Sequence, residues 1–251
     1  MPGSMSRTVT TPTLYVTPGS HPSMTARLML EHKGIGYKRR DLVAAVHRPV
    51  VRALRFPAAT VPALTIDGRR LQGTRAIARA LDEIRPDPPL LPSDSDARAA
   101  VEEAERWGDE VLQPVPRRLA WWAMRRDRSR VRSFLEGARL GMPVAVASAT
   151  AAPIIWMAAK LNAADDDAVH ADLQALPGML DKVDGYIETG VLGGASRNTA
   201  DFQIATSVRL LMCFDDLRPM IDSRPAGAHA MRLCPDFPGH IGPVLRPHER
   251  P

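Results

Sequence analysis

The first third of the chain alternates short apolar runs with amphipathic stretches. Residues 13–17 (TLYVT) are β-prone, lie between two prolines and predict a buried strand. A helix is predicted from Pro22 to Gly34, because proline suits a first helical turn, glycine suits a helix end, and the apolar residues between them share one face. Residues 35–42 alternate weakly and predict a second strand.

The next stretch carries the strongest hairpin signal in the sequence. TVPALTIDG and RRLQG are strand-like and meet at Asp67 and Gly68, a pair typical of two-residue hairpin turns. Residues 74–84 follow as an amphipathic helix. With an irregular helix or loop around Pro49 and Pro57, the predicted order is β, α, β, loop or helix, β, β, α.

A proline-rich stretch, PDPPLLPSDS, then interrupts all periodicity, because proline sustains neither a helix interior nor a central strand. Everything that follows has helical periodicity until a tail rich in Pro and Gly. We therefore expect a disordered N-terminus (1–11), an α/β domain (12–85), a linker (86–95), an all-helical domain (96–222) and an extended tail (223–251).

Within the helical half, one long amphipathic helix is predicted from Asp96 to about Arg118. The clearest helix runs from Asn198 to Met220, with an almost wholly apolar interior. Asn198 is its predicted N-cap, and Asp201 three residues later forms a variant of the capping box. This helix is expected at the centre of the second core.

Composition narrows the functional classes. The net charge of +5 comes from arginines scattered among acids, not from basic clusters interleaved with aromatic residues, so we expect no nucleic-acid partner. No run of eighteen apolar residues occurs, and MPGSMSRTVTTP lacks the blocks of a secretory signal. These features predict a cytoplasmic protein with no membrane partner.

Cysteine and histidine spacing gives no sign of a metal or disulfide site. Cys213 and Cys234 are the only cysteines, too few for a disulfide framework and too far apart for a CxxC pair. The seven histidines show no HxxxH or HxH spacing. We therefore expect no metal.

The turn between the first strand and helix, VTPGSHPS, holds the candidate chemistry. Ser20 is either a helix cap only, or a hydroxyl that donates a hydrogen bond to an anion at a helix N-terminus. Ser23 is a second candidate within the first helical turn, and His21 carries a ring that titrates near neutrality. The turn alone leaves these alternatives open.

Four landmarks in order resemble the cytosolic glutathione S-transferase family over about residues 12–222. They are LYVTPGSHPSMTARLMLEHKGIGY, TVPALTIDG, LQGTRAIARALDE and NTADFQIA. The resemblance implies a thioredoxin-like α/β domain followed by an all-α domain. It also implies a serine-type, divergent bacterial member that is homodimeric and uses glutathione or another low-molecular-weight thiol as co-substrate.

The same resemblance implies the thiol site. Ser20 stands where serine-type members carry the hydroxyl that stabilises the thiolate, with Ser23 and His21 as further candidates. The Val61–Pro62 bond is expected to be cis, so that Val61 pairs with the cysteinyl part of the thiol. Thr74 replaces the family's serine at the start of the third helix.

Gly73 departs from the family's pattern. Family members usually place Glu or Gln there, where it grips the γ-glutamyl end of glutathione. Loss of that charge-assisted bond of about 1.5–3 kcal/mol predicts weaker glutathione binding or a different thiol.

The resemblance places the pocket for a small apolar electrophile between the two domains. Candidate residues on the first helices of the second half are Trp107, Trp121, Trp122 and Met124. Arg117, Arg118 and Arg125 are candidates for an anionic end of the pocket. Tryptophan and methionine at helical spacing also suit a core.

Three functions follow from the resemblance. The first is a transferase that activates a small thiol for attack on an apolar electrophile. The second is a non-catalytic protein of the same fold that binds a ligand or partner, an alternative favoured by Gly73. The third is a thiol-dependent isomerase or dehalogenase, which the sequence does not separate from the first.

Overall fold

The computed structural model describes residues 11–249, in which four short strands form one mixed sheet. The sheet order is β2-β1-β3-β4, with β1 parallel to β2 and antiparallel to β3, and with β3 antiparallel to β4. The strands are β1 (Thr13–Val16), β2 (Lys38–Asp41), β3 (Ala63–Ile66) and β4 (Arg69–Gln72). Asp67 and Gly68 both have positive φ (48° and 78°), as a tight hairpin turn requires.

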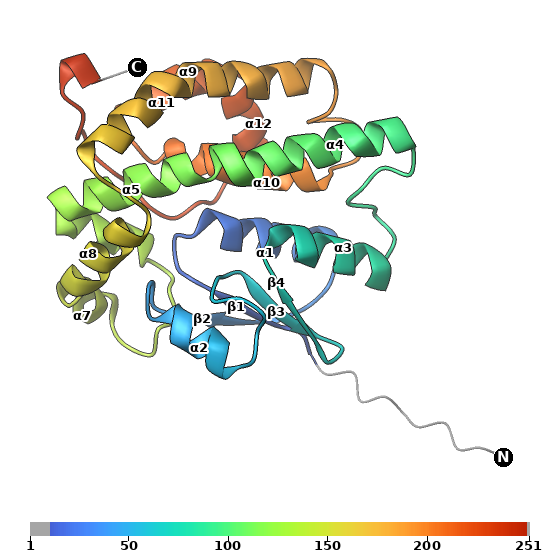
Figure 1. Ribbon diagram of the computed structural model, residues 1–251, viewed down its shortest axis with the longest axis horizontal. Coiled ribbons are helices and arrows are strands. Elements are labelled where there is room, and N and C mark those ends of the chain that lie inside the picture. The colour runs from blue at the N-terminus through green and yellow to red at the C-terminus, as the bar shows by residue number, and fades with distance from the viewer. Residues whose placement is uncertain (1–10, 250–251) are drawn as a thin grey trace.

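Three helices complete this α/β half, and they are α1 (His21–His32), α2 (His47–Ala53) and α3 (Thr74–Ile84). α1 and α3 lie between the sheet and the layer of longer helices, whereas α2 lies on the far side of the sheet from that layer (Figure 1). The arrangement confirms the thioredoxin-like domain expected at the N-terminus. The Val61–Pro62 peptide bond is cis, as expected, and so is Asp87–Pro88 in the linker.

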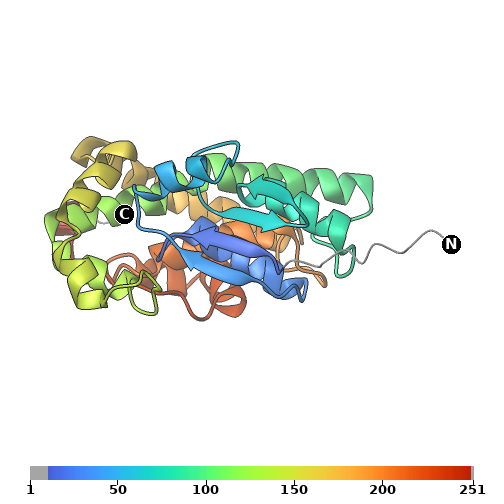
Figure 2. The same ribbon diagram turned by 90° about the horizontal axis from the view of Figure 1, so that it is seen from below.

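The rest of the described chain is helical, as expected for the second half. Its longer helices are α4 (Ser95–Trp107), α5 (Pro114–Arg126), α8 (Ala152–Leu161), α9 (Asp166–Glu188), α10 (Thr199–Leu211) and α12 (Pro225–Leu233). The shorter ones are a wide π-helical turn η1 (Gly108–Leu112), η2 (Arg128–Arg130), α6 (Val131–Phe134), α7 (Val144–Ala149), α11 (Arg218–Asp222) and η3 (Pro247–Glu249). Figure 2 shows the sheet from below, with the segment from α6 to α8 at one end of the molecule.

The single helix expected from Asp96 to Arg118 is instead divided into α4, η1 and α5. The break comes where the chain approaches α10 most closely. A Cβ atom at Gly108 would lie 2.9 Å from Cγ1 of Ile204, so only glycine allows this contact. Pro114 then begins α5, because proline lacks the N–H that a helix interior needs.

The central helix α10 confirms the expected capping box. The Asn198 side chain accepts from the Asp201 N–H, and the Asp201 carboxylate accepts from the Asn198 N–H at 2.8 Å. Every residue of α10 is buried, and the helix packs against α1, α4 and α12. It ends at Leu211 instead of continuing to Met220, because the Ile241 N–H of the tail donates to the Cys213 carbonyl, and the Ile241 carbonyl accepts from the Asp215 N–H.

The C-terminal segment 223–251 also differs from the extended tail expected. Residues 225–233 form α12, which packs against α9 and α10, whereas residues 234–246 have no regular helix. The N-terminal segment expected to be disordered lies, apart from residue 11, outside the described residues. No helix within residues 11–249 is long and apolar enough to cross a membrane.

Candidate functional site

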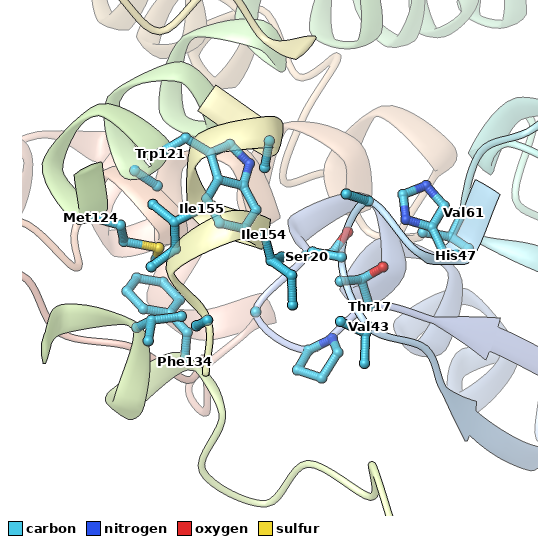
Figure 3. A pocket seen from close by; sticks show the side chains of 18 of the residues that line it. Thr17, Ser20, Val43, His47, Val61, Trp121, Met124, Phe134, Ile154 and Ile155 are labelled. Atoms are coloured by element: carbon cyan, nitrogen blue, oxygen red, sulfur yellow. The ribbon is translucent and has the colours of Figure 1, made fainter. Parts of the chain in front are cut away.

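A cavity of about 360 Å³ lies where the α/β half meets the helical half. One wall comes from the turn between β1 and α1, from the start of α2 and from residues 59–61 before the cis proline. The other comes from α5, α6 and α8. Figure 3 shows Thr17, Ser20, Val43, His47 and Val61 on the first wall, facing the apolar side chains of Trp121, Met124, Phe134, Ile154 and Ile155.

Ser20 caps α1 and also lines the cavity. Its backbone is extended (φ −79°, ψ 117°), and its Oγ accepts a long 3.4 Å hydrogen bond from the Ser23 N–H. Accepting that bond leaves the hydroxyl proton free to be donated. The capping role and a role as hydrogen-bond donor toward the cavity are therefore compatible in this geometry.

Ser23 lies one helical turn further on, away from this cavity. It is buried, and its Oγ accepts from the Thr17 N–H at 3.4 Å, which ties the end of β1 to α1. It lines a second hollow of about 400 Å³, which shares Thr17 to Ser20 with the first. The structure thus places Ser20, but not Ser23, on the wall of the interdomain cavity.

His21 connects the two halves of the molecule. Its ring is buried, and Nε2 lies 3.2 Å from the backbone carbonyl of Gln113, which accepts only, so Nε2 carries the proton. Burial, and then the nearby Arg117 guanidinium, lower the pKa of His21 from 6.5 to about 3. The imidazole is therefore neutral near pH 7, and its Nε2 proton is engaged in an interdomain contact.

Val61 lines the cavity beside the cis Val61–Pro62 bond, next to a loop held by Gln72. The Gln72 amide accepts from the Ala58 N–H at 2.5 Å and donates to the carbonyls of Ala58 and Thr60 at 2.8 and 2.5 Å. Three hydrogen bonds from this one side chain hold the backbone of residues 58–60, which leads to Val61. Nothing in the sequence indicates this role, since the pattern predicts Gln72 only as part of a strand.

Gly73 and Thr74 lie at the start of α3 and do not line the cavity. They are linked to the cis proline, because the Gly73 N–H donates to the Pro62 carbonyl at 3.0 Å. Gly73 has φ +83°, and a Cβ atom there would meet nothing within 4 Å. The position where the resemblance expects an acid or amide is thus open space, next to the buried Thr74.

The candidate pocket tryptophans separate according to their helix faces. Trp121 lines the cavity, together with Arg117 and Met124 of the same helix. The adjacent Trp122 points about 100° away, is buried in the core and donates from Nε1 to Asp166 at 2.7 Å. Trp107 instead packs edge-on against Tyr186, with ring centroids 5.9 Å apart.

Two of the candidate arginines also lie away from the cavity lining. Arg125 is exposed near the end of α5. Arg118 donates to Asp172 at 2.5 Å and so belongs to an ion pair between α5 and α9. Only Trp121 of the three expected tryptophans lies on the cavity wall, whereas Trp107, Trp122 and Arg125 do not line it.

Two lining residues, Thr17 and His47, have no signal in the sequence. Among the described residues, three buried polar atoms at the cavity lack a hydrogen-bond partner, and they are Thr17 Oγ1, His47 Nδ1 and Arg117 Nε. Burial, and then the adjacent Arg48, lower the pKa of His47. His47 was hidden in a segment expected to be irregular, and Thr17 at the end of a strand, so neither had a periodicity that indicated a cavity.

Phe134 is another such residue, and it touches both the turn that carries Ser20 and the tail. A Cβ atom at Gly19 would lie 2.8 Å from its Cδ1, and one at Gly239 would lie 2.3 Å from its Cε1. The tail is held there by Arg130, which donates to the Gly242 carbonyl at 2.9 Å, and by the bond from the His240 N–H to Ser133 Oγ at 2.9 Å. Residues far apart in sequence thus pack against the turn that carries Ser20.

The two cysteines lie away from the cavity lining and are buried. Burial raises the pKa of Cys213 to about 12 and that of Cys234 to about 11, so neither is a thiolate near pH 7. Within residues 11–249 no group of His, Cys, Asp and Glu side chains is placed to hold a metal ion. The chemistry that this cavity offers is therefore hydrogen bonding from hydroxyls, next to apolar walls and arginines.

Comparison with known proteins agrees with this geometry. The family model of the glutathione S-transferase N-terminal domain matches residues 14–89. A probable maleylacetoacetate isomerase from Caenorhabditis elegans is 34% identical over 106 residues, which are 41% of this chain and 49% of that protein. The chain thus spans about half the length of this curated relative.

Solved structures extend the similarity of fold to nearly the whole chain. A glutathione S-transferase from Sinorhizobium meliloti has a TM-score of 0.60 and is 21% identical, covering 96% of this chain and 98% of that one. A glutathione S-transferase from Methylobacterium radiotolerans, solved in complex with glutathione sulfonate, has a TM-score of 0.56 and is 17% identical, covering 94% and 99%. At these identities the likeness concerns the fold.

Proposed function

We propose that the chain is a glutathione S-transferase-like protein that binds glutathione or another small thiol and activates its sulfur for attack on an apolar electrophile. The observation that carries the proposal is the position of Ser20. Its hydroxyl lies at the N-cap of α1, on the wall of an apolar cavity and opposite Trp121 and Ile155. A hydroxyl at a helix N-terminus favours a thiolate over a thiol, through a hydrogen bond and through the helix dipole.

In this proposal the thiol peptide lies along Val61, and its sulfur points toward Ser20. Gln72 holds the loop of residues 58–60, which fixes the backbone that the thiol would pair with. The thiolate attacks the electrophile, a sulfur–carbon bond forms, and the leaving group departs with its bonding electrons. Ser20 only donates a hydrogen bond and forms no covalent bond.

Substitution of Ser20 tests this role. Ser20→Ala is expected to lower turnover with glutathione and a chromogenic aryl chloride by roughly 10- to 100-fold, since a hydrogen bond to a charged group contributes about 1.5–3 kcal/mol. The pKa of the bound thiol, followed by thiolate absorbance, should rise by about 1–2 units. Ser93→Ala, an exposed serine in the linker, is the control.

Unchanged turnover in Ser20→Ala would show that another hydroxyl donates the hydrogen bond to the thiolate. Thr17 is the next one to substitute, because its buried Oγ1 has no partner among the described residues and lines the same cavity. Thr17→Val keeps the shape of the side chain and removes the hydroxyl.

A second candidate function is a binding protein of the same fold without catalysis. The open space beside Gly73 favours it, because no side chain there holds the γ-glutamyl end of glutathione. If no thiol raises the melting temperature or supports turnover, this candidate replaces the first.

The kind of thiol-dependent reaction is also a proposal. The similarity to a probable maleylacetoacetate isomerase favours an isomerase as the alternative to conjugation, and a dehalogenase stays a further alternative. Product analysis separates them, because isomerisation returns the thiol unchanged whereas conjugation consumes it. A homodimer and a cytoplasmic location are proposed from the family likeness alone, and light scattering of the purified chain tests the first.

A further inference from the structure

Arg117 is an arginine at the cavity without a carboxylate in its immediate reach. Its Nη1 donates a long hydrogen bond of 3.5 Å to Oε1 of Gln113, and its buried Nε has no partner among the described residues. Asp109 is the acid whose charge acts on Arg117, but its carboxylate accepts a hydrogen bond from the Gln113 amide. By contrast, the neighbouring Arg118 has an ion pair with Asp172 at 2.5 Å.

The charges of the cavity lining favour an anionic ligand. No aspartate or glutamate among the described residues lines it, whereas Arg48 and Arg117 do. The two histidines in the lining, His21 and His47, have lowered pKa values and add no positive charge near pH 7. Since a partly buried cation is costly unless an anion or dipole compensates it, a ligand with a negative group gains from this cavity.

The position of Arg117 assigns that negative group to the electrophile rather than to the thiol. Arg117 lies on α5, one turn before Trp121 and two turns before Met124, so the cation continues the apolar wall of the helical half. It also acts electrostatically on His21, the residue after Ser20. Arg48, on α2 next to His47, lies on the opposite wall, where the proposed thiol binds.

We infer that the electrophile is an apolar molecule bearing a carboxylate, and that Arg117 binds this carboxylate while Trp121 and Met124 contact the apolar part. A planar carboxylate matches the guanidinium, whose two terminal nitrogens present a parallel pair of N–H donors. This inference deepens the proposed function and rests on it for the reaction, but not for the binding of the carboxylate.

The test uses two aryl chlorides that share a dinitro-chlorobenzene ring. One carries a ring carboxylate, and the other carries a trifluoromethyl group in its place. With both, the thiolate sulfur bonds to the ring carbon and chloride leaves with the bonding pair. Arg117→Gln is expected to lower kcat/KM for the carboxylate by about 10- to 100-fold and to leave the trifluoromethyl substrate within about threefold.

Control variants separate a contact with the ligand from a structural role. Arg117→Lys keeps the charge and should restore part of the loss, whereas Arg128→Gln, at an exposed arginine in η2, should change neither substrate. Equal losses on both substrates in Arg117→Gln would overturn the inference, because Arg117 would then act only by holding Gln113. A selective loss in Arg48→Gln instead of Arg117→Gln would also overturn it.

Direct binding keeps the inference testable if the wild-type chain turns over neither substrate. The carboxylate compound is titrated without thiol, and quenching of tryptophan fluorescence reports its binding. Binding that is tighter than that of the trifluoromethyl compound, and that is lost in Arg117→Gln, supports the inference even where the enzyme proposal fails. Equal binding of the two compounds to the wild-type chain contradicts it.

Discussion

The ring of Phe134 packs directly against Gly19, so closely that a Cβ atom at position 19 would lie 2.8 Å from Cδ1 of the ring. Gly19 precedes Ser20 in the turn between β1 and α1, and its φ is +69°. The position of the Ser20 hydroxyl thus depends on a contact between the first turn of the α/β half and a short helix of the other half. This contact makes the first prediction.

Gly19→Ala is expected to destabilise the fold and displace Ser20. A non-glycine residue at positive φ costs about 1 kcal/mol, and the collision with Phe134 adds to it, so the free energy of unfolding should fall by about 2–4 kcal/mol. Gly137→Ala is the matched control, because Gly137 has φ +71° and a Cβ atom there meets nothing within 4 Å. Chemical denaturation measures both variants, and equal losses would show that Phe134 imposes no packing limit.

The contact between His21 and the Gln113 carbonyl predicts how stability depends on pH. The pKa of His21 in the folded chain, about 3, lies below its ordinary value of 6.5, so below pH 6.5 the unfolded chain binds more protons. The contribution of the neutral His21 ring to the free energy of unfolding is fully present above pH 6.5 and is lost as the pH falls toward 3. Between pH 6.5 and 5 the free energy of unfolding should fall by about 2 kcal/mol through His21.

Comparison with His21→Gln isolates the contribution of His21 to the free energy of unfolding. Burial lowers the pKa of His32 and His47 too, whereas it raises the pKa of Glu105 and Asp172, so the wild-type profile alone mixes opposite slopes. The difference in unfolding free energy between wild type and variant, measured by urea denaturation at several pH values, should shrink as the pH falls from 6.5 to 5. If this difference in unfolding free energy did not change with pH, the His21 ring would not be neutral in the folded chain.

The open position at Gly73 predicts a gain of function. Gly73→Glu would place an acid beside Thr74 at the start of α3, and glutathione affinity should rise by about tenfold or more through one charge-assisted bond. The variant should also lose about 1 kcal/mol of stability, since φ at this position is +83°. Calorimetric titration with glutathione measures the first effect and thermal unfolding the second.

Gly73→Ala is the control for this variant, because it bears the same backbone cost without a polar group. Alanine should lower stability and leave glutathione affinity unchanged. If glutamate and alanine behave alike toward glutathione, the thiol does not extend to this end of α3, and another thiol becomes the ligand to test.

Local sequence patterns predicted most elements of the α/β half. The pair Asp67–Gly68 needed only its own turn chemistry to define the hairpin, and the Asn198–Asp201 capping box needed only residues three apart. The prediction of the proline-rich linker likewise depended only on residues close together in the sequence. The single helix expected from Asp96 is instead divided at the π-helical turn that begins at Gly108, where the chain packs against Ile204, a residue almost a hundred positions away.

The site divides in the same way. Ser20 was a candidate from its turn, and the resemblance to the transferase family pointed to Ser20, Val61 and Trp121, all of which line the cavity. The choice between Trp121 and Trp122 was not visible, because both fit the same helix and only the packing of α5 on α8 and α9 decides which ring meets the cavity.

The sequence by itself determined the fold class, the order of the elements and the turn that carries Ser20, because caps, turns and hydrophobic periods act over a few residues. Only the tertiary structure decided which side chains share the cavity. His47, Phe134 and Arg117 come from three separate elements, and the closeness of Phe134 to Gly19 and Gly239 depends on how distant segments pack. A cavity forms between elements, and no local pattern specifies what lies across it.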